Sequence, residues 1–399
     1  MIFPFLTEDI TEGSVTITIP SLKIFARGPS EYIPSKAPVF YNPRMALNRD
    51  LAVLALRTYQ RRIGREFRVC EPLAGCGIRG IRFAVEVEET MSVVINDLNP
   101  LAVKLASFNV EKNALHHKIV VENKDANFLL NNYASPDKRF DAIDIDPYGA
   151  PSPFMDSAIR ALRDGGLLAL TATDTAPLCG VNPQACIRKY FGKPLRTEYC
   201  HELAVRLLIN SLTFSAAKYG FGIKVLFSHS TDHYIRVYAQ INHSASAANE
   251  AIKKIGYIFH CFHCLNREWF FGFTNFKEPK CDVCGGRMDV AGPLWLGELS
   301  DREFCKDILA EVERVKLSKS KRILRLVNDV LREGEACPTY YVVDRISKRL
   351  GLSPPPKGEV IKKLFEYRYH AMQTHFNSRG IKSNAPINTV EKAIKELSS

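Results

Sequence analysis

The sequence predicts an α/β protein built on a doubly wound parallel sheet, and three observations support this prediction. Between Phe67 and Thr171, short apolar runs alternate with helical stretches, which is typical of parallel strands joined by crossover helices. A glycine-rich turn follows the first run, where such folds bind nucleotides. Hydrophobic residues make up 46% and charged residues 24% of the 399 residues, as in folded globular proteins. A chain of this length should form two or three domains.

The expected elements follow in order from the N-terminus. The first 45 residues are rich in turns, with a β-like alternation at 14–19, and a helical pattern covers 45–63. The expected strands of the sheet are 67–70, 92–96, 119–122, 140–145 and 167–171, with helices at 100–113 and 155–162 and two closing strands at 222–229 and 235–242. We therefore predict a first domain at 1–245, a cysteine-bearing module at 246–297 and a basic α/β C-terminal domain at 298–399.

Charge and cysteine content narrow the possible environments. The net charge of +11 suits a nucleic-acid partner but also simple solubility. No apolar run approaches the roughly 20 residues of a membrane span, and residues 1–9 lack a signal pattern. We expect a cytoplasmic protein without a membrane partner, whose eleven cysteines are free thiols or metal ligands.

The first strand leads into a candidate nucleotide cradle. Gly75, Gly77 and Gly80 form a G-x-G-x-x-G pattern, which lets the backbone approach a ligand closely. Asp97 ends the next strand, where a carboxylate can accept both ribose hydroxyls, and Asp125 follows the third. This pattern fits NAD and S-adenosylmethionine almost equally.

Glu71 lies beside the same turn. The sulfonium and zwitterionic tail of S-adenosylmethionine favour an acid there, whereas a pyrophosphate would sit over the helix N-terminus. Glu71 could equally be a solvated residue at the end of the strand.

The fourth strand ends in Asp146-Pro147-Tyr148-Gly149. The exocyclic amine of a base is a poor nucleophile, because its lone pair is delocalised into the ring. Asp146 and the carbonyl of Pro147 could accept its two N–H bonds, and Tyr148 offers a face on which a flipped base can stack. A common Asp-Pro-Gly turn is the alternative. Asp144 shares a face with Asp146, and we interpret it as a structural acid.

These motifs carry a resemblance to a known family. The segments Phe40-Tyr-Asn-Pro-Arg-Met-Ala-Leu-Asn-Arg-Asp, Pro72-Leu-Ala-Gly-Cys-Gly-Ile-Arg-Gly-Ile-Arg and Asp144-Ile-Asp-Pro-Tyr-Gly, with Thr374-His-Phe and Gly380-Ile-Lys-Ser-Asn-Ala-Pro, make the chain similar to the tRNA (guanine(26)-N(2))-dimethyltransferases, class I S-adenosylmethionine-dependent enzymes. The resemblance covers nearly the whole chain. It implies a Rossmann-like methyltransferase domain and tRNA as the substrate.

The resemblance also implies roles for individual residues. Asp146 would be the catalytic carboxylate, and Phe40 and Tyr148 would flank the target base. The positions that match contacts to the methyl donor are Arg49, Arg79, Asp97, Asp125 and Ala126. From the pattern alone, Phe40 is expected in the core rather than at a base, and Arg49 could be a charge on a helix surface.

A four-cysteine cluster is the strongest local signal in the chain. Cys261-x2-Cys264 and Cys281-x2-Cys284 have the spacing of a structural zinc site. Unliganded thiols and an iron–sulfur cluster are the alternatives. His260 and His263 are expected to be bystanders.

The region after Lys316 is rich in Lys and Arg. We expect a helix-turn-helix-like unit at 344–352 and 358–370, and an irregular arm at 379–386 near the active-site cleft. Tyr369, His370, His375 and Phe376 would interleave aromatics with a basic, RNA-binding surface.

We therefore expect a monomeric guanine-N2 methyltransferase acting on tRNA. The rival interpretations are an amino-methyltransferase of another RNA or DNA base, an inactive zinc-bearing RNA-binding protein and, more distantly, an NAD oxidoreductase.

Overall fold

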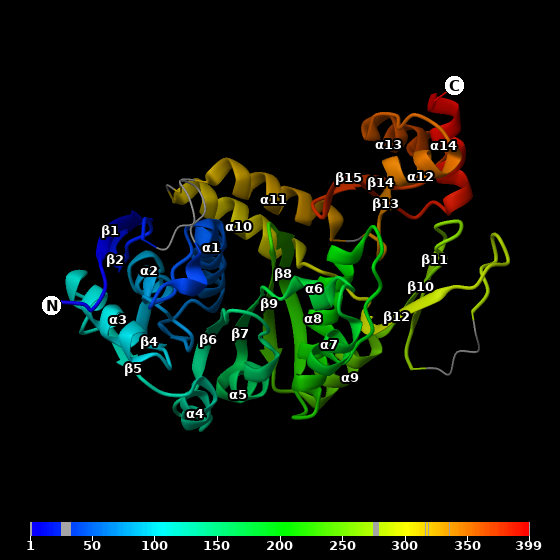
Figure 1. Ribbon diagram of the computed structural model, residues 1–399. Helices are drawn as coiled ribbons and strands as arrows, with labels where there is room; N and C mark the ends of the chain where they lie inside the picture. Colours follow the sequence, from blue (N-terminus) through cyan, green and yellow to red (C-terminus); the bar gives the residue numbers. More distant parts are fainter. Residues whose placement is uncertain are drawn as a thin grey trace.

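The structure is a computed structural model that describes residues 2–24, 33–273, 279–315, 317, 319–334 and 336–398. Its centre is a seven-stranded sheet in the order β5-β4-β3-β6-β7-β9-β8 (Figure 1). The strands are β3 (Phe67–Glu71), β4 (Thr90–Asn96), β5 (Ile119–Glu122), β6 (Phe140–Ile145), β7 (Leu162–Ala172), β8 (Gly222–Thr231) and β9 (Tyr234–Asn242). β3 to β7 are parallel, and β9 runs antiparallel to both β7 and β8. The predicted α/β class, the mostly parallel sheet and the closing strand pair are confirmed.

The two faces of this sheet belong to two different hydrophobic cores. Successive side chains of a strand point to opposite faces. Val69 on β3 accordingly joins the core shared with α1–α3, whereas its neighbour Cys70 joins the core shared with α4, α5 and α8. The helices are α1 (Ala46–Ile63), α2 (Ile78–Glu86), α3 (Pro100–Lys112), α4 (Ala126–Asn132), α5 (Met155–Ala161), α6 (Thr175–Leu178), α7 (Pro183–Tyr190), α8 (Cys200–Ala217) and α9 (Ala245–Lys253).

An N-terminal hairpin and two further helices complete the first core. The hairpin consists of β1 (Thr7–Glu12) and β2 (Val15–Pro20), and the helices are α10 (Arg302–Arg314) and α11 (Ser320–Glu333). Phe304 of α10 and Val327 of α11 belong to the same buried cluster as α1, and Arg57 of α1 bonds to Glu311 of α10 at 2.8 Å. These two helices therefore pack on the first domain, and the domain boundary at 298 stays a prediction.

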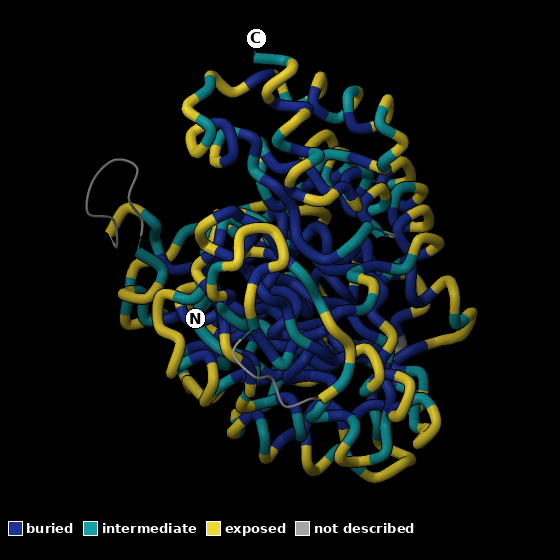
Figure 2. The backbone as a smooth tube through the Cα atoms, turned by 90° about the vertical axis from the view of Figure 1, so that its right-hand side faces the viewer, coloured by how far each residue is buried: buried dark blue, intermediate teal, exposed yellow. Residues whose placement is uncertain are grey.

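The remaining elements form two small sheets. Each has a hydrophobic cluster of its own, and the strands of the first sheet also contribute Ile258 and Leu294 to the second core of the main sheet. β10 (Ile255–His260), β11 (Arg267–Phe271) and β12 (Asp289–Trp295) make the cysteine module, in the order β11-β10-β12. The C-terminal unit contains β13 (Tyr341–Val342), β14 (Ala371–Thr374), β15 (Asn377–Ser383), α12 (Val343–Leu350), α13 (Lys357–Glu366) and α14 (Ile387–Ser398). Its helices form the upper lobe in Figure 2, with exposed residues on their outer side.

One predicted segment has a different structure. The irregular arm expected at 379–386 is mostly strand β15, which pairs with both β13 and β14. Ile381 is fully buried in the C-terminal core, and this burial fixes the segment in the sheet. The described part of the chain contains no helix that is both long enough and apolar enough to cross a membrane.

Candidate active site

The glycine turn after β3 is shaped by close packing. Gly75 and Gly77 have positive φ angles of 54° and 80°, which disfavour any residue with a Cβ. A Cβ on Gly75 would lie 2.8 Å from the backbone oxygen of Phe40, and one on Gly80 would lie 2.2 Å from Ile95 Cγ2. The glycines therefore bring residue 40 to the turn and seat α2 against β4.

A cavity of about 610 Å³ opens at the carboxyl ends of β3, β4 and β6. Ligands of doubly wound sheets bind at this edge. The cavity brings together nine of the predicted site residues: Phe40, Arg49, Glu71, Gly75, Arg79, Asp97, Asp146, Pro147 and Tyr148.

The predicted residues Gly77, Asp125 and Ala126 are not among the residues that line this cavity. Asp125 caps α4 by accepting the backbone N–H of Phe128 at 3.0 Å, and Ala126 is buried as the first residue of that helix. Their proposed contacts with a methyl donor, like all the residue roles, stay predictions.

Asp97 is held in place by the backbone. One carboxylate oxygen accepts the N–H of Gly75 at 2.8 Å, and the other accepts the N–H of Asn99 at 2.9 Å. The acid at the end of β4 is thus tied to the glycine turn and oriented into the cavity.

Arg79 forms the centre of a charged cluster beneath the cavity. Its guanidinium pairs directly with Asp146 Oδ2, and lies 3.5 Å from Asp144 and 3.6 Å from Glu71. Arg236 of β9 reaches the same cluster and also donates to Asp144, at 2.9 Å for Oδ1. Three acids therefore share two arginines.

The pKa shifts follow this arrangement. Burial opposes the ionisation of Asp144, but Arg236 and Arg79 hold its pKa below the ordinary value. Asp144 is therefore an ionised structural acid, as the sequence indicated. Glu71 is not a solvated residue at the end of the strand, because its side chain is 4% exposed. Burial raises the pKa of Glu71 to about 8, although Arg79 and the N–H of Gly80 oppose the shift.

Arg49 is anchored by the N-terminal hairpin. It donates two hydrogen bonds of 2.6 Å to the carboxylate of Glu12 and one of 3.2 Å to the carbonyl of Asn42. Burial disfavours the charged form of Glu12, yet Arg49 and Arg82 hold its pKa below the ordinary value. Arg49 is buried, so the alternative of a charge on a helix surface is wrong.

Two aromatic rings lie at the rim of the cavity. Tyr148 is 79% exposed and Phe40 is 41% exposed, so the expectation of a core position for Phe40 is wrong. Their ring centroids are 6.0 Å apart, within the range of direct aromatic contact. A base that entered between them would have to separate the rings.

The sequence analysis missed four residues of this site: Glu12, Asp174, Lys189 and Arg236. Lys189 lines the cavity and pairs with Asp174 at 2.8 Å. Each is distant in sequence from the glycine turn and from the Asp-Pro-Tyr-Gly segment, and its own segment shows no recognisable motif.

The four predicted cysteines form one compact group. Their sulfurs all lie within 4.8 Å of one another, with Cys261–Cys284 at 3.5 Å and Cys264–Cys281 at 3.4 Å. A Cβ at position 286 would lie 3.3 Å from Cys284 Sγ, so Gly286 leaves room for the sulfurs. Neither His260 nor His263 belongs to the group.

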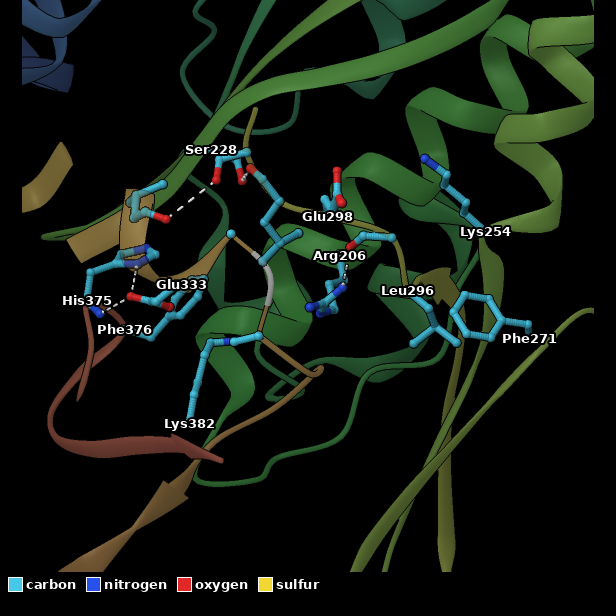
Figure 3. A pocket seen from close by; sticks show the side chains of 16 residues that line it. Arg206, Ser228, Lys254, Phe271, Leu296, Glu298, Glu333, His375, Phe376 and Lys382 are labelled. Atoms are coloured by element: carbon cyan, nitrogen blue, oxygen red, sulfur yellow. Dashed lines mark hydrogen bonds and ion pairs between the residues drawn. The ribbon is translucent and has the colours of Figure 1, made fainter. Parts of the chain in front are cut away.

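A second cavity, of about 340 Å³, lies where α8, α11 and β15 meet (Figure 3). It contains no residue of the glycine turn. Glu202 of α8 pairs here with Lys382 of β15 and with Arg206, each at 2.8 Å. These two cations hold the pKa of Glu202 down to about 2, against the effect of burial. The cavity is a junction between the first domain and the C-terminal unit.

Two aromatics that were expected on a basic surface lie in this junction instead. His375 accepts or donates a bond of 2.8 Å with Glu333, depending on its tautomer, and Phe376 is 8% exposed. Both are buried because the β14–β15 turn packs against α11. In the basic run that starts at Lys316, residues 316 and 318 lie outside the described residues.

Comparisons with known proteins give the family. Residues 13–395 match the family described as TRM: N2,N2-dimethylguanosine tRNA methyltransferase. A tRNA (guanine(26)-N(2))-dimethyltransferase of Methanothermobacter thermautotrophicus is 41% identical over 97% of this chain and 98% of its own length. A tRNA (guanine(26)-N(2)/guanine(27)-N(2))-dimethyltransferase of Aquifex aeolicus is 35% identical over 98% of this chain and 96% of its own.

A solved structure agrees with these relatives. Trm1 from Pyrococcus horikoshii, in complex with S-adenosyl-L-methionine, superposes with a TM-score of 0.85 at 34% identity, and the match covers 97% of this chain and 99% of that one. The chain therefore belongs to the N2,N2-dimethylguanosine tRNA methyltransferase family.

Proposed function

We propose that this chain transfers methyl groups from S-adenosylmethionine to the exocyclic N2 amine of guanine 26 in tRNA, and that it adds two. The observation that carries the proposal is the meeting of Asp146, the exposed Tyr148 and the glycine turn in one cavity. The family membership and the donor-bound relative support it. We also propose that it acts as a monomer, since one chain contains every residue named here, and that it acts in the cytoplasm.

The residues present suit the donor. Bound S-adenosylmethionine supplies an electrophilic methyl group on a cationic sulfur. Asp97 would hold the ribose hydroxyls, and the glycine turn leaves the backbone open to the adenosine part. The three acids around Arg79 and Arg236 leave one negative charge uncompensated when all are ionised, which favours a cationic ligand over a pyrophosphate.

Asp146 would act on the amine of the base. Its Oδ2 is held by Arg79, so Oδ1 is the oxygen that would accept an N–H of the amine, with the Pro147 carbonyl accepting the other. The N2 lone pair forms the new bond to the methyl carbon while the carbon–sulfur bond breaks, and its electron pair stays on sulfur. The proton lost from nitrogen passes to Asp146 and then to solvent.

Phe40 and Tyr148 would receive the extruded guanine. Stacking of a base on an aromatic ring contributes about 1–3 kcal/mol, which offsets part of the cost of extrusion. Two methyl additions require a second donor to bind after the first transfer.

The four-cysteine group suits a structural zinc ion. Thiolates are the preferred ligands of zinc, and four protein ligands leave no open position for substrate. We place this metal in the β10–β12 module, where it would hold the two cysteine-bearing turns together.

The experiment is transfer of labelled methyl to unmodified tRNA transcripts that carry guanine or adenine at position 26, each with guanine at 27. We expect label with guanine 26 alone, recovered as dimethylguanosine after nuclease digestion. Label in the adenine-26 transcript would extend the site to guanine 27. No label in either transcript, from folded protein loaded with zinc, would overturn the proposal.

A further inference from the structure

A second group of soft metal ligands lies on the methyltransferase domain, apart from the four-cysteine group. Cys179, Cys200 and His201 bring two sulfurs and an imidazole nitrogen within 4.8 Å of one another. Among the described residues, only this group and the four cysteines bring three or more such atoms together.

The geometry of the group matches that of a metal site. Cys179 Sγ lies 3.6 Å from His201 Nδ1. Two ligand atoms on a tetrahedral zinc, with bonds of about 2.3 Å to sulfur and about 2.0–2.1 Å to nitrogen, lie about 3.5 Å apart. The atoms therefore need little movement to bind one ion.

The local fold also prepares one thiol for metal binding. Cys200 is the first residue of the 18-residue helix α8, and its sulfur lies close to the Cys179 thiol and to the amide groups of Cys200 and His201. A helix N-terminus stabilises a thiolate, which is the form that binds metals. Cys186, by contrast, is fully buried in the apolar core and acts as a small hydrophobic residue.

The group is open to solvent on one side. His201 lines a cavity of about 340 Å³ together with Asp232 of the β8–β9 turn. His233 of the same turn is close enough to His201 for their charges to interact. A fourth position can therefore be filled by water, as in sites that keep an exchangeable position.

We infer that Cys179, Cys200 and His201 form a second metal site, which takes zinc or a similar thiolate-binding divalent cation. Such an ion would link the segment after β7 to the start of α8. That segment also contacts the catalytic turn, because Thr173 and Gly149 exchange hydrogen bonds of 2.7 and 3.0 Å. The metal would brace one wall of the active site.

The first test is the zinc content of the purified full-length chain, measured by mass spectrometry after dialysis against metal-free buffer. We expect about two zinc ions per chain, one for each group. The variant Cys179→Ser/Cys200→Ser should retain about one, and so should Cys281→Ser/Cys284→Ser. Cys337→Ser is the matched control, because Cys337 is partly buried and outside both groups, and it should retain both ions. One zinc in the wild type, unchanged in the first double variant, would overturn the inference.

A second measurement does not depend on how the variants fold. X-ray absorption at the zinc edge of the wild type should give an average of about three sulfurs and one nitrogen or oxygen per zinc, whereas four sulfurs would indicate the four-cysteine site alone and overturn the inference. A thiol titration of unfolded, unreduced protein tests the alternative that Cys179 and Cys200 form a disulfide. The wild type has eleven cysteines, so eleven reactive thiols are expected if no disulfide forms. About nine thiols in the wild type, with no further loss in Cys179→Ser/Cys200→Ser, would show a disulfide instead of a metal site.

Discussion

Glu71 and Glu202 are both buried glutamates, but their pKa values move in opposite directions. Glu71 shares Arg79 with two other acids, and burial raises its pKa to about 8. Glu202 has two cations to itself, Arg206 and Lys382, and its pKa falls to about 2. Both side chains are buried, so the number of cationic partners decides whether each carboxyl group is ionised. At the junction, two cations balance the charge of Glu202. At the catalytic cavity, the acids outnumber the arginines, which leaves a negative charge for a cationic ligand when all the acids are ionised.

Asp146 should be the most sensitive position of the cavity, because it is the acid that would touch the substrate. Asp146→Asn keeps the size of the side chain but cannot take up the proton, and it should lower the rate of methyl transfer by about 10²–10⁴-fold. Donor binding should persist, because the remaining acids still face the cavity. Single-turnover transfer and calorimetry measure the two quantities. Asp137→Asn, at an exposed acid of the same domain, is the control, and equal activity in both variants would contradict the role of Asp146.

The same substitution at the two buried glutamates tests the comparison directly. Glu202→Gln removes the anion between two buried cations, and it should lower the free energy of unfolding by about 3–5 kcal/mol at pH 7. Glu71→Gln replaces an acid whose ionisation in the unfolded chain weakens folding at that pH, and it should raise the free energy of unfolding by up to about 3 kcal/mol. Chemical denaturation measures both. Equal losses would show that burial, and not the balance of partners, controls these groups.

The pH dependence of stability should also differ between the two residues. Folding lowers the pKa of Glu202 from 4.5 to about 2, so its contribution is complete above pH 4.5 and is lost as the pH falls toward 2. Folding raises the pKa of Glu71 from 4.5 to about 8, so its contribution is present below pH 4.5 and is lost as the pH rises through 8. Each Glu→Gln variant should lack the corresponding slope in denaturation curves measured across pH, and a variant that keeps its slope would contradict the assignment.

The aromatic rim adds binding that does not depend on charge. Tyr148→Ala should weaken productive binding of tRNA by about 1–3 kcal/mol, which is about 5–150-fold in kcat/KM, with little change in donor affinity. Tyr219→Ala removes an exposed aromatic ring that does not line the catalytic cavity, and it should behave as the wild type. A loss of donor affinity in Tyr148→Ala would mean that the ring supports the donor instead of the base.

The sequence predicted the parts of this site that depend on chain order. Strand ends and the glycine turn placed Glu71, Asp97 and Asp146 at one edge of the sheet, because parallel strands bring their carboxyl ends together. The four-cysteine group could also be predicted, because its members lie in two short Cys-x2-Cys segments. Phe40 could not be placed, since its exposure depends on the approach of the glycine turn to its backbone.

The compensating charges were beyond prediction for a related reason. Arg236 meets Asp144 across 92 positions of sequence, and Lys382 meets Glu202 across a domain junction. No local pattern distinguishes such residues from ordinary strand residues. The number of partners, and with it each pKa, becomes visible only in the folded chain.

Proton release on donor binding shows whether the buried acids of the cavity bind a cationic donor. A bound cation should favour the ionised form of Glu71 and lower its pKa. As the pH is raised toward 8, donor affinity should therefore increase by up to about tenfold per pH unit. Calorimetry of S-adenosylmethionine binding at pH 7, in buffers with different ionisation enthalpies, counts the protons released. We expect release of a substantial fraction of one proton by the wild type and almost none by Glu71→Gln. No release by the wild type, or equal release by both proteins, would contradict the claim that the surplus acid of the cavity is kept for a cationic donor.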